Sequence, residues 1–294
     1  MTDLSARPPS AVDIDFAAVV QRLHDIRTNF KDIEESQLIF ELINGQQTAI
    51  GVVQSISQHV PSFDHLEKLQ SMIINLAIEV PFTQPSLVSL LEAFYSCSNK
   101  EIHNGIWGTF GMNEGDLHSS LMHDETSAEA YLNINGFEAR LWQAMGEEVE
   151  DFVYGSLIGN LARSIDREEP DDHFHHTPDV GIAAACLWMI HGGERAWRLS
   201  TGDYHDEEAK DWRGDLWRGR RGYSVERWRL WKRRFEDAVE GRVGRVGRET
   251  KRLAGAAVAN MEAVEGRVEG VGRETKRLAG AAVANMEAVE ILGP

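Results

Sequence analysis

Three histidines and two aspartates lie within six residues of the chain, in the stretch DDHFHH at 171–176. Imidazole and carboxylate groups are good ligands for zinc, nickel and copper. His173, His175 and His176 are therefore the candidate metal ligands. Prolines flank the stretch and predict a loop, whereas catalytic zinc sites usually take their ligands from rigid, separated elements. A solvated acidic loop is the favoured interpretation, and a metal-dependent enzyme or sensor is the alternative.

A second stretch, 212–235, combines nine lysines and arginines with six aromatic residues and two acids, a net charge of +7. Basic residues interleaved with aromatic ones can bind single-stranded nucleic acid through phosphate contacts and base stacking. The candidates for the phosphate contacts are Arg218, Arg220, Arg221 and Arg229. The whole chain carries −17 and the residues from 237 on are neutral, so the remainder of residues 1–236 carries −24 (−17 − 7). That acidic remainder offers an intramolecular partner, and nucleic-acid binding is the less favoured hypothesis. We expect four aromatic side chains to enter the core: Trp217, Trp228, Trp231 and Phe235.

The other reactive groups form no coherent catalytic set. The sequence has neither a P-loop nor a dinucleotide fingerprint, and no G-x-S-x-G nucleophile elbow, so we predict no cofactor. Cys97 could be a reactive thiol, whereas Cys186 lies in an apolar run and is expected to be inert core. The catalytic residues of any activity are unknown, and the sequence favours a protein that is not an enzyme.

Composition predicts a soluble intracellular protein. Hydrophobic residues make up 42% of the 294, and the net charge of −17 repels nucleic acid and anionic membranes. The longest apolar run, 180–190, is shorter than the roughly 20 residues that cross a bilayer. With only two cysteines and no secretory signal pattern, we predict a reducing compartment, the cytoplasm or the nucleus.

Apolar residues recur at steps of three and four along most of the chain, the period of a helix with one buried face. Helices are predicted over 16–30, 38–43, 66–80, 87–94 (capped by Pro85-Ser86), 131–145, 149–165, 179–199 and from 224 on. Residues 49–56 are predicted to be helical, with a strand left open by their β-branched residues. Four glycines and little periodicity predict a loop over 103–120. The predicted fold class is all-α, an irregular multi-helix bundle with an appended repetitive helical tail.

The chain ends in a direct repeat of 25 residues, with 22 positions identical between 237–261 and 262–286. Such identity indicates a recent duplication. Because an α-helix turns about 100° per residue, 25 residues return to within about 20° of the starting direction and keep an apolar stripe in phase. We predict a disordered leader over 1–11, a helical globular domain over 12–240 and a repetitive tail over 241–294 outside that domain. The tail is interpreted as a tolerated appendage, with a coiled-coil or partner-docking arm as the alternative.

One motif resembles a known family. The pattern LW-G--GYS-ERW--WK-RFE at 216–236 is similar to the closing signature of a large group of uncharacterised fungal proteins, known only as a domain of unknown function. Segments 133–142 and 183–197 also resemble that group. The resemblance implies a fungal source, an all-helical body and an intracellular protein, and it supplies no catalytic residues. The motif residues that we single out are Trp217, Gly219, Gly222, Ser224, Glu226, Arg227, Trp228, Trp231 and Phe235.

The motif also has a physical interpretation. Gly219 and Gly222 permit a tight loop, and Ser224 can cap a following helix that has Glu226 in its first turn. The aromatic residues after the cap then share one face, so the segment is expected to be a helix that closes the bundle. The leading functional hypothesis is a non-enzymatic interaction or scaffold module, with a protein partner bound by the tail or by the acidic surface.

Overall fold

The computed structural model describes residues 16–59, 61–107, 110, 120–121, 127–146, 159, 161–168, 177–202 and 214–267. Every regular element among these residues is a helix, which confirms the predicted all-α class. Contacts group the chain into two compact units, Met1–Leu117 (unit 1) and His118–Pro294 (unit 2). The predicted domain over 12–240 therefore contains parts of both units. The predicted leader, the histidine stretch and residues 268–294 of the repetitive tail lie outside the described residues.

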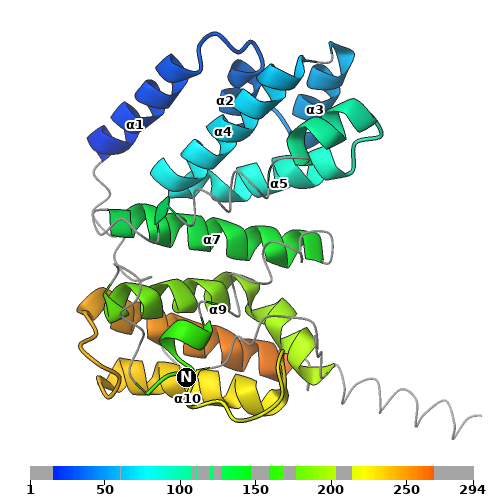
Figure 1. Ribbon diagram of the computed structural model, residues 1–294. Coiled ribbons are helices and arrows are strands. Elements are labelled where there is room, and N and C mark those ends of the chain that lie inside the picture. The colour runs from blue at the N-terminus through cyan, green and yellow to red at the C-terminus, as the bar shows by residue number, and fades with distance from the viewer. Residues whose placement is uncertain are drawn as a thin grey trace, which may run out of the picture. The chain divides into compact units, whose positions relative to one another are not determined.

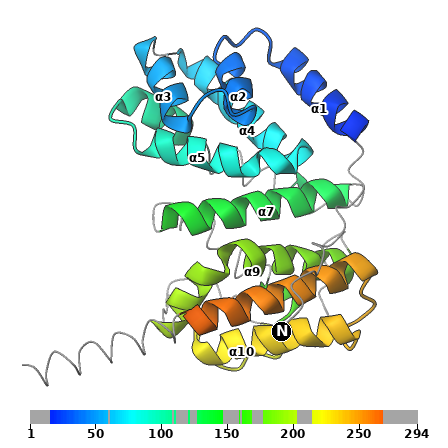
Figure 2. The ribbon, with the colours of Figure 1, turned by 180° about the vertical axis from the view of Figure 1, so that it is seen from behind.

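Unit 1 is a helical bundle (Figures 1 and 2). Its elements are α1 (Phe16–Asn29), α2 (Ser36–Ile43), α3 (Ala49–Gln58), α4 (Phe63–Glu79), the 3-10 helix η1 (Pro81–Thr83), α5 (Gln84–Tyr95) and a helix over 100–107. The apolar residues of α4 supply much of its core, because Leu69, Met72 and Ile73 are 1% exposed or less. Burial of such side chains is the main force that stabilises a bundle of this kind.

The sharp turn between α4 and α5 is fixed by side chains. Pro81 cannot continue α4, and the Thr83 hydroxyl donates hydrogen bonds to the Leu76 and Val80 carbonyls at 3.3 and 2.8 Å. The Gln84 side-chain amide donates to the Ala77 carbonyl at 2.8 Å, so the last carbonyls of α4 are satisfied.

Among the described residues no single helix is long and apolar enough to cross a membrane. Phe63–Glu79 and Pro81–Tyr95 have the required length and apolar composition only when they are taken together, and the chain bends by 115° between them.

Of three predictions about local structure in unit 1, the helix over 49–56 is confirmed and two others are wrong at their limits. Residues 49–58 form a helix and not a strand, because the Thr48 hydroxyl accepts a hydrogen bond from the Gly51 amide at 3.1 Å. The predicted start of α5 after Ser86 is wrong, since the helix begins at Gln84 and holds Pro85 in its first turn. The predicted loop over 103–120 is wrong for residues 103–107, where a helix starts after the Asn99 carboxamide accepts from the Glu101 amide at 3.0 Å.

Unit 2 is built on the contact between α7 (Ala128–Met145) and α9 (Pro178–Thr201), which lie side by side in Figures 1 and 2. The two helices come close where Gly192 faces Trp142, because a Cβ at Gly192 would lie 2.9 Å from the indole ring. The buried Trp188 indole donates to the Asn135 side chain at 2.8 Å. Helix α10 (Val225–Glu240) packs against α9.

Residues 246–265, the first of two identical segments and called the first copy from this point, pack within unit 2, whereas the sequence predicted a tail outside the globular domain. A helix over 248–267, orange in Figures 1 and 2, lies along α9 and α10. Its small and apolar residues at steps of three and four form a buried stripe that matches the face offered by those two helices. The buried members of the stripe are Ala254, Ala257, Met261 and Val264. The second copy, 271–290, lies outside the described residues.

The stability of unit 2 is expected to depend on His191 below neutral pH. Burial, and then the charge of Arg140, lower the pKa of His191 to about 4, against about 6.5 in an unfolded chain. The unfolded chain therefore binds the proton first, so the contribution of His191 is complete above pH 6.5 and is lost as the pH falls towards 4. We expect a loss of about 1–3 kcal/mol from this residue.

Urea unfolding followed by tryptophan fluorescence at pH 7 and 4.5 measures this dependence. His191→Asn should reduce the difference in the free energy of unfolding between these two pH values. His24→Asn, at an exposed position of α1, should leave this difference unchanged. An equal difference for wild type and His191→Asn would show that His191 does not cause the pH dependence.

Candidate functional site

The closing motif forms the start and the buried face of α10. Gly222 has a φ of +87°, a conformation that glycine adopts most readily. The Ser224 hydroxyl accepts a hydrogen bond from the Arg227 amide at 3.1 Å and caps α10 as the sequence predicts, with Glu226 in the first turn. Three aromatic residues follow on the buried face, each 0% exposed: Trp228, Trp231 and Phe235.

Trp217 differs from the prediction that it enters the core. Its side chain is only half-buried, and the indole donates to the Arg220 carbonyl at 2.7 Å. Gly219 lies against this ring, since a Cβ at that position would come within 2.3 Å of the indole. The absence of a side chain at Gly219 thus lets the indole fold back onto its own loop, and a positive φ is not required there.

Arg227 and Asp166 form a fully buried ion pair. Asp166 Oδ2 accepts from Arg227 Nε at 3.1 Å and from Nη2 at 2.5 Å, and both side chains are 0% exposed. Asp166 Oδ1 accepts from the Trp231 indole at 2.7 Å, and Arg227 Nη1 donates to the Gly222 carbonyl at 2.9 Å. Burial raises the pKa of Asp166, and the charge and hydrogen bonds of Arg227 and the Trp231 indole oppose that shift.

This cluster attaches the 161–168 segment to α10. The Arg234 guanidinium donates to the Ile165 and Arg167 carbonyls at 3.2 and 2.6 Å, on both sides of Asp166. The sequence motif includes Arg227 but did not predict Asp166, because a single aspartate after a helical apolar pattern carries no signal of its own. Since its charges are enclosed and paired with each other, the cluster is suited to holding the fold rather than to reacting with a substrate.

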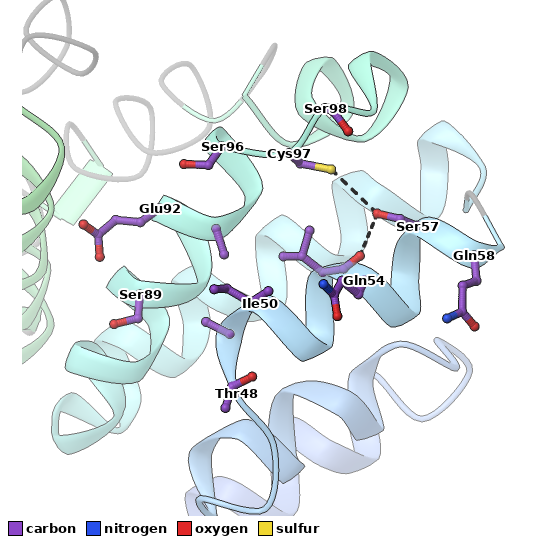
Figure 3. A pocket seen from close by; sticks show the side chains of 13 residues that line it. Thr48, Ile50, Gln54, Ser57, Gln58, Ser89, Glu92, Ser96, Cys97 and Ser98 are labelled. Carbon is purple, nitrogen blue, oxygen red and sulfur yellow. Dashed lines mark hydrogen bonds between the residues drawn. The ribbon is translucent and has the colours of Figure 1, made fainter.

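Unit 1 holds a candidate binding site, a groove of about 1010 Å³ between α3 and α5 (Figure 3). Its apolar part is formed by Ala49, Ile50 and Val53 of α3 and by Ala93 of α5. Hydroxyl and amide side chains surround this part, and Glu92 is the one charged residue among those that line the groove. An apolar surface with a few polar groups at its edge is typical of binding sites.

The two cysteines lie in different settings. Cys97 lines the groove, and its Sγ lies 3.6 Å from the Ser57 hydroxyl, which can donate to the Val53 carbonyl at 2.7 Å. Cys186 is buried in α9, and burial raises the pKa of its thiol, in line with an inert core residue. Among the residues that line the groove, the Ser57 hydroxyl is the group within hydrogen-bond distance of the Cys97 thiol, and a hydroxyl is a poor general base.

The predicted metal ligands His173, His175 and His176 lie outside the described residues, and the metal-site hypothesis remains a prediction. Within the part of the chain that the structure does describe, no group of three or more histidine, cysteine, aspartate or glutamate side chains could hold a metal ion.

Comparison with known proteins identifies the family. Residues 71–235, more than half of the chain, match the family model described as "Protein of unknown function (DUF3632)". The match ends at Phe235, the last aromatic residue of the closing motif, and does not include the repeat. No curated protein and no solved structure gives a significant match. The groove residues before 71 also lie outside the matched segment, whereas Asp166, Arg227 and Trp231 lie within it. The chain belongs to the DUF3632 family of proteins of unknown function.

Proposed function

We propose that this protein is a non-enzymatic interaction module of the fungal cytoplasm or nucleus, and that the groove between α3 and α5 binds an amphipathic helix of a partner protein. The observation that carries the proposal is Ile50, whose side chain lines the groove and is 65% exposed. Single exposed apolar residues are common on protein surfaces. Ile50 differs from such residues because it lies in a groove beside Val53 and Ala93, where a side chain of a partner can be buried against it.

The walls of the groove suit a helical partner. Both walls are helices, and a third helix can lay its apolar face between two others, as in known helix-in-groove recognition. The apolar residues at the centre would receive aliphatic side chains. Ser89 of α5 and Gln54 of α3 also line the groove, where they can form hydrogen bonds with polar groups of the partner.

The charge at the groove favours a basic residue on the partner. No described lysine or arginine forms an ion pair with the Glu92 carboxylate, which is half-buried at the edge of the groove. A lysine or arginine beside the apolar face of the partner helix would pair with it. The proposed ligand is therefore an amphipathic helix with an aliphatic stripe and a flanking basic residue.

Burial of the closing motif supports this proposal over nucleic-acid binding. Trp228 and Trp231 are 0% exposed, so their rings cannot stack on bases. Arg227 is engaged with Asp166 inside unit 2. Binding to nucleic acid would depend on exposed arginines and on the half-buried Trp217.

The proposal is tested with a fluorescein-labelled helical peptide of leucine and lysine, with leucines at i, i+3, i+4 and i+7, titrated in a fluorescence anisotropy assay. Ile50→Asp should weaken binding by about tenfold or more, because it places a charge at the centre of the apolar contact. The matched control is Val20→Asp, on the exposed side of α1 in the same unit, where Val20 is 52% exposed. This variant should bind within about twofold of wild type.

A peptide of the same composition, scrambled so that its leucines share no face, separates groove binding from attraction to the acidic protein. Equal binding of the two peptides, or equal effects of Ile50→Asp and Val20→Asp, would reject the groove as the binding site.

A further inference from the structure

The first copy of the repeat docks on α9 and α10 through a definite set of contacts. The buried apolar stripe and two polar side chains fix the position of this helix. The Asn260 amide donates to the Met189 carbonyl of α9 at 2.8 Å. The Glu265 carboxylate accepts from the Trp228 indole at 2.7 Å and from Lys232 Nζ at 2.9 Å. A shift of the helix by one turn would break these hydrogen bonds, so the α9–α10 surface selects this sequence in this register.

Every one of these docking residues occurs again 25 positions later, because residues 246–265 and 271–290 are identical. Ala254, Ala257, Asn260, Met261, Val264 and Glu265 have the counterparts Ala279, Ala282, Asn285, Met286, Val289 and Glu290. The α9–α10 surface therefore cannot distinguish the two copies by these contacts. We propose that this surface is a binding site for either copy, and that Val271–Glu290 of the same chain exchanges with Val246–Glu265.

The connection to α10 decides which copy is resident. The first copy follows α10 after the short segment 241–247, in which Val243 is buried, whereas the second copy would be joined through 241–272. The probability of closing a flexible loop falls with about the 3/2 power of its length, which disfavours the second copy by about tenfold. The first copy is thus the resident helix, and the second copy takes the surface when the first is disabled.

Two matched substitutions in the full-length chain test this exchange. Ala257→Asp places a carboxylate in the buried stripe of the first copy, and Ala282→Asp makes the same change in the second copy. Ala257→Asp should lower the folding equilibrium constant of unit 2 by about tenfold, the effect of the longer connection. Ala282→Asp should leave it unchanged. The double variant should lower it by about a hundredfold or more, since neither copy can then dock without burying a charge.

Urea unfolding followed by tryptophan fluorescence gives these constants, and sedimentation of Ala257→Asp at two protein concentrations gives its mass. A monomer with the tenfold effect supports exchange within one chain. If Ala257→Asp is as unstable as the double variant, or if the double variant is as stable as wild type, the proposal is overturned. It is also overturned if Ala257→Asp shows the tenfold effect only as a dimer, because the helix on the α9–α10 surface would then come from a second chain.

Discussion

Arg227→Met is expected to lower the free energy of unfolding of unit 2 by about 3–5 kcal/mol. The methionine roughly fills the space of the arginine stem, so the main loss is electrostatic. The Asp166 carboxylate would keep its hydrogen bond from Trp231 but lose the cation and the two hydrogen bonds that oppose its burial. A buried carboxylate without a partner charge is among the least favourable groups in a protein interior.

Tryptophan fluorescence during urea unfolding is a suitable measurement, because seven of the eight tryptophans lie in unit 2. Arg229→Met is the matched control on the same helix, and at an exposed position it should change the free energy by less than about 0.5 kcal/mol. Replacing both partners, as Asp166→Leu with Arg227→Met, should recover part of the loss, since no charge is then left buried. A loss below about 1 kcal/mol for Arg227→Met would show that the pair does not hold unit 2 together.

Trp231→Ala is expected to have a comparable effect, a loss of about 3–5 kcal/mol. The ring is 0% exposed, and its removal leaves a cavity beside Tyr223, whose ring packs edge-on against it at a centroid distance of 6.0 Å. The same substitution removes the indole that donates to Asp166. Two independent contributions, packing and a hydrogen bond to a charged group, are lost together.

Trp231→Phe separates the two contributions, because it keeps most of the ring and loses the hydrogen bond. We expect this variant to lose about 1–3 kcal/mol, less than Trp231→Ala. Trp217→Ala is the control for a tryptophan of the same motif that is only half-buried, and it should cost less than Trp231→Ala. Equal losses of free energy of unfolding for Trp217→Ala and Trp231→Ala would show that burial does not set the contribution of Trp231 to stability. Because Trp231 and Arg227 share Asp166, the effects of their substitution should not be additive.

Hydrophobic periodicity was sufficient to predict most of the helices. The steps of three and four in the sequence correspond to α1, α2, α4, α7, α9 and α10, with limits that agree within a few residues. One error arose where a cap decided the outcome. Asn99 starts a helix in a segment whose glycines predicted a loop, because one hydrogen bond from a side chain to the backbone can outweigh composition over a few residues.

The partners of long-range contacts could not be predicted. Asp166 and Arg227 are 61 positions apart, and nothing in the sequence around Asp166 marks it as the buried partner of that arginine. Ile50 and Cys97 could be noted as residue types, but the groove that they share depends on how α3 packs against α5. Periodicity shows which face of a helix is buried and leaves open which other element covers it.

The docking of the first repeat copy has a consequence for the gene. Direct repeats gain and lose units when replication slips, and in most folds the loss of a whole helix would remove function. Here an allele that has lost one unit still encodes a complete docking helix after α10, because the units are equivalent over 246–265 and 271–290. An allele that keeps one unit therefore keeps the docking helix, so alleles of this gene are expected to differ in length at this end while keeping at least one copy.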